Sequence, residues 1–432
     1  MRGLRALYSP SRAWAYAVIA TACVVPRLAV LLHERASIIS GNTEKSDVFA
    51  QVFVAHGTYG FIPGEPSAYT QPLYGWFLVP VYWLFGRTWQ SVGFYQVALA
   101  VLVAWLVYEV GRRVLSPAFA VAGAVIATFN PYLIWHDVHV NREIVDQLCS
   151  AALVLLTLLV AERPTWRRGL LLGLATGLAM LGNTRLVFVP IVCIVYLALR
   201  LPRGRVAAIS SALVIAGAGV AVAPWLIRNK LDVGCVTMTT DGRAMWKANN
   251  PRTYALLSHG EWIDNVPRNA PRPPEPGHLT PEEARGRYNA SFGKIVLHPD
   301  ECLEMTYYQN LAFDYWENDP GGKLKLAALS TKLLWQPSVF ETSGRPGAGT
   351  QLDAGRRVIE PLYMWILYAL ALAGVLFAPR YFVALALLLL LYQTAAAWAF
   401  VGATRYRVAW DFLLALLAAA ALQRAYAWRR AR

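Results

Sequence analysis

Residues 89–110 read WQSVGFYQVALAVLVAWLVYEV, an apolar segment whose charged side chain, Glu109, lies next to its end. A helix of this length crosses the hydrocarbon core of a bilayer, which is about 30 Å thick. Similar stretches recur along the chain and predict about ten transmembrane helices. They lie at 13–33, 89–110, 117–135, 144–161, 169–183, 184–200, 206–227, 357–378, 381–400 and 407–423. The sequence therefore predicts an all-α polytopic membrane protein.

The composition supports this class and excludes a soluble nucleic-acid-binding protein. Of the 432 residues, 56% are hydrophobic and 15% are charged, whereas a soluble domain carries about 25% charged residues. The net charge of +14 does not form a basic face, because the charged residues stand between the apolar segments. We expect membrane lipids as partners and no nucleic acid.

The positions of the charges predict the orientation of the chain. If the N-terminus is cytoplasmic, the Arg-rich connections lie inside, and the lysines and nearly all the acids lie outside. This holds if 72–86 does not cross the bilayer, because otherwise Arg112 and Arg113 would face outward. We therefore expect 72–86 to be a re-entrant or interfacial helix. The segment 13–33 lacks a small-residue cleavage site, so we expect a retained anchor.

Three regions follow from this topology. Residues 1–227 form an N-terminal transmembrane module whose outer loops, 34–88 and 130–143, are long enough to carry chemistry. Residues 228–356 form a small, mostly helical extracytoplasmic domain, and 357–432 form the C-terminal transmembrane helices. Cys235 and Cys302 both belong to the outer domain, and the sequence leaves open whether they pair in an oxidising compartment.

Asp47 is the first candidate catalytic residue. It stands in SDVFAQVFVAHGTYG, after the first span, at the start of a short predicted helix. A carboxylate at this place is a candidate general base for an acceptor hydroxyl. The alternative is a first-turn acid that complements the helix dipole.

The connection 130–143 holds the second group of candidates, which are His136, Asp137, His139, Arg142 and Glu143. Imidazole and carboxylate groups bind divalent metals, but hydrogen-bonded structure is the commoner role of such groups. We expect no cofactor, and a divalent metal at His136, Asp137 and His139 is the alternative. Glu143 also opens the next span, where an acid suits the helix N-terminus.

A third group is cationic and consists of Arg185, Arg228, Lys247 and Arg405. Arginines from different spans at one membrane face are suited to hold a phosphate, since the guanidinium presents two parallel donors. The alternative is that each arginine extends to the interface and pairs with lipid headgroups. Arg27 differs because it lies inside a span. We expect its side chain to form a pair with another group near the outer third of that span.

These motifs, in this order, resemble the polytopic GT-C glycosyltransferases that use lipid-linked donors. Among these, the chain is most similar to the bacterial protein O-mannosyltransferase and aminoarabinose transferase superfamily. The matching segments are Asp47 with AHGTYG, QPLYGWFLVPVYWLFG, NPYLIWHDVHVNRE, LGNTR, APWLIRN and RYR, and they cover about 1–230 and 357–425. One departure is that many relatives carry an Asp-Glu pair where this chain has Asp47 and Val48.

The resemblance implies a GT-C fold with about ten to eleven transmembrane helices and juxtamembrane helices outside the bilayer. It implies transfer of a sugar, with inversion, from a polyprenyl monophosphate to a hydroxyl of a protein, lipid or glycan. The place would be the outer face of a bacterial inner membrane. Asp47 would be the base, and Glu143 is preferred to Asp137 as second acid. Substrate-binding residues would be Tyr59, His136, Asp137, His139, Arg185, Arg228, Lys247 and Arg405.

Two other functions remain as alternatives. A lipid-pyrophosphate-linked oligosaccharide transferase or ligase would also carry outer arginines, and consumption of a pyrophosphate donor would distinguish it. A lipid-glycan flippase or transporter would be expected to show inverted repeats or charges at mid-membrane, whereas most charges here lie at span ends.

Overall fold

The computed structural model describes residues 11–41, 43–201, 204–265, 273, 279–296, 298–337 and 358–432. Within these ranges the regular secondary structure is helical, apart from an isolated β-bridge between Ile62 and Glu65. The predicted all-α architecture is confirmed.

Helices α1 to α10 form the first part of the bundle. They are α1 (Arg12–His33), α2 (Lys45–His56), α3 (Pro72–Phe85), α4 (Trp89–Val114), α5 (Pro117–Thr128), α6 (Pro131–His136), α7 (Glu143–Glu162), α8 (Trp166–Gly182), the 3₁₀ turn η1 (Thr184–Leu186), α9 (Val189–Arg200) and α10 (Arg205–Asp232).

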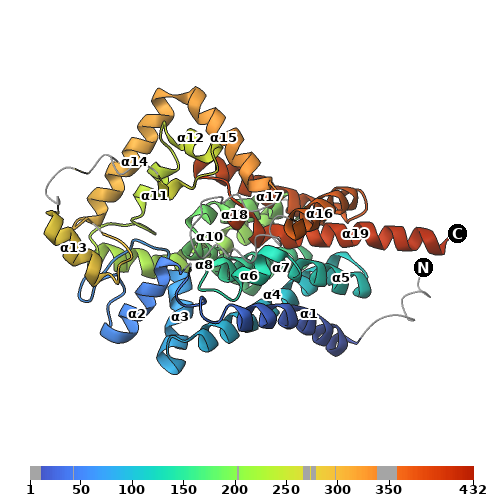
Figure 1. Ribbon diagram of the computed structural model, residues 1–432. Coiled ribbons are helices and arrows are strands. Elements are labelled where there is room, and N and C mark those ends of the chain that lie inside the picture. The colour runs from blue at the N-terminus through green and yellow to red at the C-terminus, as the bar shows by residue number, and fades with distance from the viewer. Residues whose placement is uncertain are drawn as a thin grey trace.

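The remaining helices belong to the predicted outer domain, 228–356, which we call the outer block, and to the C-terminal region. They are α11 (Gly242–Lys247), α12 (Thr253–Ser258), η2 (Ile263–Asn265), α13 (Pro281–Ala290), α14 (Glu301–Asn318), α15 (Pro320–Trp335), α16 (Glu360–Val375), α17 (Arg380–Ala399), α18 (Thr404–Arg407), η4 (Val408–Trp410) and α19 (Asp411–Arg430). In Figure 1, α14 and α15 form a peak above the bundle, and α19 extends outward from the bundle to the C-terminus.

In the described part of the chain, six helices are long and apolar enough to span a membrane, so the protein is a multi-pass membrane protein. They are Arg12–Glu34, Trp89–Val114, Glu143–Glu162, Arg205–Asp232, Arg380–Ala399 and Thr404–Arg430. Four other predicted spans, 117–135, 169–183, 184–200 and 357–378, correspond to the shorter helices α5, α8, α9 and α16. These pack within the same bundle, since α5 and α16 contact α19, and α8 and α9 contact α10.

Small residues bring α8 and α10 into close contact. A Cβ added to Gly173 would lie 2.4 Å from the carbonyl oxygen of Val214, and one added to Gly217 would lie 2.5 Å from that of Leu170. Glycine at these positions lets the two backbones touch, which is the usual way in which apolar helices associate in lipid. A larger side chain at either position would force the helices apart.

The helix predicted at 72–86 is present as the short helix α3, and its position relative to the bilayer stays a prediction. At its start, the Tyr59 hydroxyl donates to the carbonyl of Pro72 (2.8 Å). At its end, the Tyr82 hydroxyl donates to Asp47 (2.6 Å), and Arg87 donates to the carbonyl of Ile39 (2.6 Å). Both ends of α3 are therefore bound to the part of the first outer loop that precedes it.

The helix ends predicted to be cytoplasmic lie together at the opposite end of the bundle. Arg113 at the end of α4 pairs with Glu162 at the end of α7 (3.3 Å). The Tyr381 hydroxyl on α17 donates to the carbonyl of Arg113, and Arg200 at the end of α9 stacks on the Tyr381 ring at 5.3 Å. The arginine-rich ends of four helices thus share one face.

Candidate active site

Arg405 lies between two carboxylates at the predicted outer end of the bundle. Its Nη2 atom is 2.9 Å from Oε1 of Glu143, in the first turn of α7, and it also donates to Glu44, which caps α2. The amide of Glu44 donates to the carbonyl of Val140 (3.1 Å), which ties the first outer loop to the second. We call the residues gathered here the charged cluster, and they are Glu44, Arg142, Glu143, Arg185 and Arg405.

Arg142 faces the cluster from the end of the second outer loop. Its Nη1 atom donates to Oε1 of Gln71 (2.9 Å), whose amide nitrogen donates to the hydroxyl of Thr184 (3.3 Å). Arg142 also lies within electrostatic range of Glu44 and Arg405. A glutamine that accepts from a guanidinium and donates to a hydroxyl fixes the direction of the arginine side chain.

Arg185 enters the cluster from η1. Its Nη1 atom donates to the carbonyl of Val401 (2.7 Å), and its guanidinium carbon lies 3.3 Å from the centre of the Tyr406 ring. The ring face stabilises the cation while the side chain is buried. Arg185 and Arg405 therefore come together as predicted, through the segment 401–406, which leads from the end of α17 into α18.

The carboxylates of this region differ in exposure. The side chain of Glu44 is 19% exposed, while those of Glu143 and Asp47 are 2% and 0% exposed. Oε2 of Glu143 is buried and has no hydrogen-bond partner among the described residues. Burial alone would raise the pKa of Glu44, but the charges of Arg405 and Arg142 outweigh it and hold that pKa below its usual value. Glu44 is thus the most exposed of the three carboxylates, and its lowered pKa favours the ionised form.

Asp47 occupies a different place, between α2 and α3. Its Oδ1 accepts from Nε of Arg87 (2.8 Å), and its Oδ2 accepts from Nη2 of the same arginine (2.7 Å). Tyr82 donates a third hydrogen bond. Both oxygens of the predicted base are therefore engaged, and these contacts favour a role in holding α2 and α3 together.

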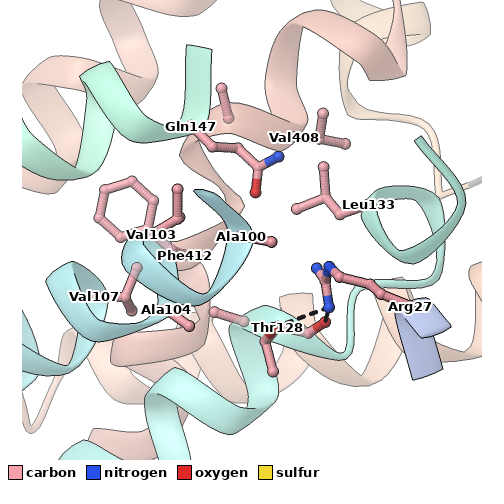
Figure 2. Close-up of a pocket in the computed structure, with 12 residues that line it drawn as sticks. Arg27, Ala100, Val103, Ala104, Val107, Thr128, Leu133, Gln147, Val408 and Phe412 are labelled. Carbon is pink, nitrogen blue, oxygen red and sulfur yellow. Dashed lines mark hydrogen bonds between the residues drawn. The ribbon is translucent and has the colours of Figure 1, made fainter. Parts of the chain in front are cut away.

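Asp137 is buried in an ion pair with Arg27. Its Oδ2 accepts from Nε (3.0 Å) and Nη2 (2.7 Å) of Arg27, and its Oδ1 accepts from Gln147 (2.7 Å). The third nitrogen of Arg27 donates to Thr128, beside a cavity of about 20 Å³ (Figure 2). A space of this size has room for one water molecule. Arg27 thus pairs as expected, and Asp137 lies outside the charged cluster.

The two histidines contact their own loop. Nδ1 of His139 lies 2.8 Å from the carbonyl of Trp135 and its ring stacks on the indole of Trp135. Nδ1 of His136 lies 3.1 Å from the amide of Asn141 and its ring stacks on Tyr132. Among the described residues no group of three or more His, Cys, Asp or Glu side chains is arranged to hold a metal ion.

Arg228 lies beside a separate groove. Its Nη1 and Nη2 atoms donate to the carbonyls of Ser67 and Tyr59 (2.9 Å each), and its Nε atom pairs with Asp232 (3.1 Å). Tyr59 is buried there, and burial raises the pKa of its hydroxyl. The groove has a volume of about 510 Å³ and is bordered by aromatic rings such as Trp76. Arg228 therefore fastens the first outer loop to α10, and most of its donors are used.

Lys247 is also placed apart from the cluster. It ends α11 in the outer block, where its amine lies 3.0 Å from Oδ1 of Asp264. No contact of Lys247 with a cluster residue is found among the described residues, so the structure does not bring this predicted phosphate ligand to Arg405.

Comparisons with known proteins agree with the fold. A family model described as "Dolichyl-phosphate-mannose-protein mannosyltransferase" matches residues 66–227, which include Arg142, Glu143 and Arg185. No curated protein sequence matches the chain. An oligosaccharyltransferase from Archaeoglobus fulgidus, tethered to an acceptor peptide, is similar at TM-score 0.52 and 13% identity, over 96% of this chain and 50% of that one.

Two further structures are similar. The same archaeal enzyme with Zn and sulfate matches at TM-score 0.53 and 12% identity, over 96% of this chain and 49% of the other. ArnT from Cupriavidus metallidurans, bound to undecaprenyl phosphate, matches at TM-score 0.43 and 16% identity, over 94% and 78%. The chain spans about half the length of the archaeal oligosaccharyltransferase.

The protein is thus a polytopic membrane protein with the GT-C glycosyltransferase fold. Within that class, its segment 66–227 is similar to the protein mannosyltransferase family. The resemblance expected from the sequence motifs is confirmed at this level.

Sequence reasoning did not single out Glu44 or Gln71. Glu44 stands three residues before Asp47 and carries the same functional group. Only the folded structure shows that Glu44, and not Asp47, contacts Arg405. Gln71 precedes Pro72, and only the proximity of two distant loops gives its amide a partner in Arg142.

Proposed function

We propose that the protein is a glycosyltransferase that moves a sugar from a polyprenyl-monophosphate donor to an acceptor hydroxyl at the outer face of the membrane. The observation that carries this proposal is the position of Arg405 between Glu44 and Glu143, beside Arg142 and Arg185. Such a cluster offers a carboxylate for the hydroxyl proton and guanidiniums for a phosphate. The description of the matching family, whose donor is dolichyl phosphate mannose, supports the donor class.

The donor's phosphate would bind at Arg142 and Arg185. Among the described residues Arg142 donates one hydrogen bond, to Gln71, so its other N–H groups remain for phosphate oxygens. Arg405 already holds two carboxylates and would bridge base and leaving group. Guanidiniums aimed at the place where charge develops stabilise the transition state without reorganisation.

The base would be a carboxylate of the cluster rather than Asp47. A general base must come within hydrogen-bond distance of the proton that it removes, and Glu44 is the most exposed of the three acids. Asp47 has no exposed surface and is bound at both oxygens by Arg87. Glu143 lies behind Arg405 and orients it, while Asp47 supports α2.

The reaction would be a single displacement at the anomeric carbon. The acceptor oxygen forms a bond to that carbon as its proton passes to Glu44, and the bond to the phosphate oxygen breaks. The polyprenyl monophosphate leaves with the electron pair, and its negative charge is held by Arg142 and Arg185. One displacement with one base inverts the configuration of the sugar.

The experiment that tests this function uses the purified protein in nanodiscs with radiolabelled polyprenyl-phosphate sugars. Peptide, lipid and glycan acceptors are each supplied, the peptide because a structurally similar protein was crystallised with one. We expect one donor to be consumed and free polyprenyl monophosphate to appear in equal amount, with the label on the acceptor.

Two variants form a matched pair, one in the charged cluster and one distant from it. Glu44→Gln is expected to lower consumption at least about 100-fold. Lys247→Ala, which changes a residue paired with Asp264 in the outer block, is expected to leave it unchanged. Consumption of a pyrophosphate-linked donor alone would favour an oligosaccharide transferase. Full turnover by Glu44→Gln would contradict the assignment of the base.

A further inference from the structure

Hydrogen bonds from the outer block bind a short segment of the first outer loop, Ala68 and Tyr69. The amide of Ala68 donates to Oε2 of Glu301 (3.1 Å), and the carbonyl of Ala68 accepts from the amide of Thr240 (2.9 Å). The carbonyl of the next residue, Tyr69, accepts from the hydroxyl of Thr239 (2.8 Å). Both backbone groups of the fully buried Ala68 are therefore bound by residues more than a hundred positions away.

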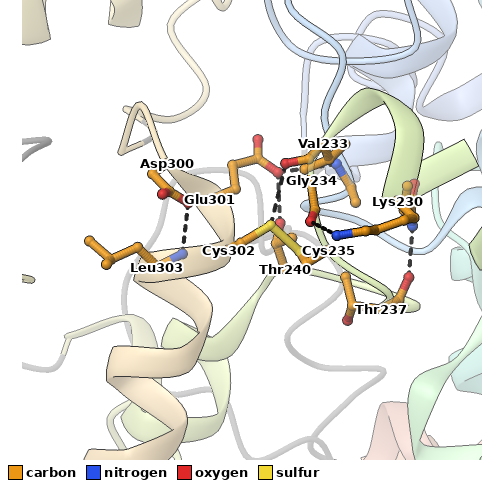
Figure 3. Close-up of a disulfide and its surroundings, with 12 residues drawn as sticks. Lys230, Val233, Gly234, Cys235, Thr237, Thr240, Asp300, Glu301, Cys302 and Leu303 are labelled. Carbon is orange, nitrogen blue, oxygen red and sulfur yellow. Dashed lines mark hydrogen bonds between the residues drawn. A yellow bond between two sulfur atoms is a disulfide. The ribbon is translucent and has the colours of Figure 1, made fainter.

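Glu301 is itself fixed by a covalent link. It opens α14 directly before Cys302, which forms a disulfide with Cys235 just after α10 (Figure 3). The same Oε2 atom also accepts from the hydroxyl of Thr240 (2.8 Å). The disulfide joins residues 67 positions apart, so the start of α14 stays against the end of α10 and the carboxylate of Glu301 stays above Ala68.

The held segment leads directly to the charged cluster. Gln71 follows three positions after Ala68, and its side chain accepts from Arg142. Tyr69 carries the amine of Lys45 over its ring at 4.6 Å, and Lys45 is the neighbour of Glu44. A shift of Ala68 would therefore move both a partner of Arg142 and the start of α2.

We propose that Glu301 is a positioning residue of the active site, which holds Ala68, and through it Gln71 and Arg142, in the geometry that stabilises the donor phosphate as it leaves. The Cys235–Cys302 disulfide keeps Glu301 in this place. The inference rests on the proposed function for its catalytic consequence, while the mechanical connection from Glu301 to Arg142 can be measured independently.

Hydrogen exchange of the full-length protein in nanodiscs tests the connection without any reaction. In Glu301→Ala, the amide of Ala68 loses its acceptor, so its exchange should accelerate about tenfold or more. Peptides that contain Gln71 and Arg142 should also exchange faster. Glu301→Gln, which keeps an oxygen acceptor, should restore most of the protection.

Glu304→Ala is the matched control, because Glu304 is a second buried glutamate on α14 and its partner, Arg243, belongs to the outer block. Its variant should leave exchange at Ala68 unchanged. Unchanged exchange at Ala68 and Arg142 in a folded Glu301→Ala protein would overturn the proposal. Faster exchange at Ala68 without any change at Arg142 would overturn it as well.

The catalytic consequence is tested by a double-mutant cycle with Gln71→Ala. Each single variant should lower kcat about tenfold at unchanged donor KM, and the double variant should be no slower than the worse single one. Multiplicative losses would mean that Glu301 acts independently of Gln71 and would overturn the catalytic role. If the wild-type protein consumes no donor, the proposed function fails, while the exchange experiment still decides the positioning contact.

Discussion

Arg87 donates two parallel hydrogen bonds to the carboxylate of Asp47, from Nε to Oδ1 (2.8 Å) and from Nη2 to Oδ2 (2.7 Å). Arg87 also donates to the carbonyl of Ile39, so this ion pair closes the first outer loop onto the end of α3. The acid that the resemblance marked as the base is therefore part of the loop's framework, while Glu44, one helical turn earlier, faces Arg405.

The two acids are expected to respond differently to loss of charge. Glu44→Gln should lower transfer by at least about 100-fold at nearly unchanged stability, because a general base contributes about 10²–10⁴-fold. Asp47→Asn should retain measurable transfer and lose about 1–3 kcal/mol of stability, because Arg87 is left without its carboxylate. Single-turnover assays and thermal unfolding in detergent measure these effects. Inactive Asp47→Asn of wild-type stability would restore Asp47 as the base.

Arg142 is expected to act mainly in the transition state. Arg142→Ala should lower kcat about 100-fold, and Arg142→Lys should recover only part of this loss, because an ammonium group cannot donate two parallel hydrogen bonds to a phosphate. Steady-state kinetics with a labelled donor measure both. Equal rates for the Lys and Ala variants would argue against a bidentate phosphate contact.

The buried pair of Arg27 and Asp137 predicts an asymmetric response to mutation. Arg27→Met alone should cost about 3–5 kcal/mol, because Asp137 would remain buried without its cation. The double variant Arg27→Met with Asp137→Leu should regain most of this loss. Chemical denaturation in detergent measures the free energies, and an additive loss in the double variant would contradict the interpretation.

The lowered pKa of Glu44 predicts the direction of the acid limb of the rate profile. Burial raises this pKa and the charges of Arg405 and Arg142 lower it below the usual 4.5. The ionised form is therefore present above that pKa and is lost as the pH falls through it, and its contribution to stability follows the same sign.

In wild type, kcat/KM should stay constant down to a pH below 4.5. In Arg142→Ala the acid limb should shift to higher pH, because one of the lowering charges has been removed. Initial rates measured across this range, with stability followed in parallel, report the shift. An acid limb that stays in place in Arg142→Ala would exclude Glu44 as the titrating group.

Much of the architecture followed from apolar segments and the distribution of arginine. These patterns predicted α1, α4, α7, α10, α17 and α19 as spans, and they predicted that the helix at 72–86 does not cross. They overestimated the length of the spans predicted at 117–135 and 184–200. The first ends as α5 at Thr128, before a second helix begins at Pro131, and the second opens with a 3₁₀ turn capped by Asn183 before α9 begins at Val189.

The site was harder to predict, because membership in it is decided by which side chains face one another in the folded protein. Arg185, Arg405 and Glu143 were found from charge at span ends, and the structure brings them together. Arg228 and Lys247 carry the same charge at similar positions, yet the first binds Ser67 and Tyr59 and the second binds Asp264. Spacing along the chain does not encode these contacts.

The ion pair between Arg27 and Asp137 joins residues 110 positions apart in the chain. During synthesis the first span must therefore enter the bilayer while its counterion has not yet been made, and the guanidinium has to be accommodated at the lipid boundary or by water. Helix α1 can reach its final depth only after the second outer connection has emerged, so its insertion is completed well after its own synthesis.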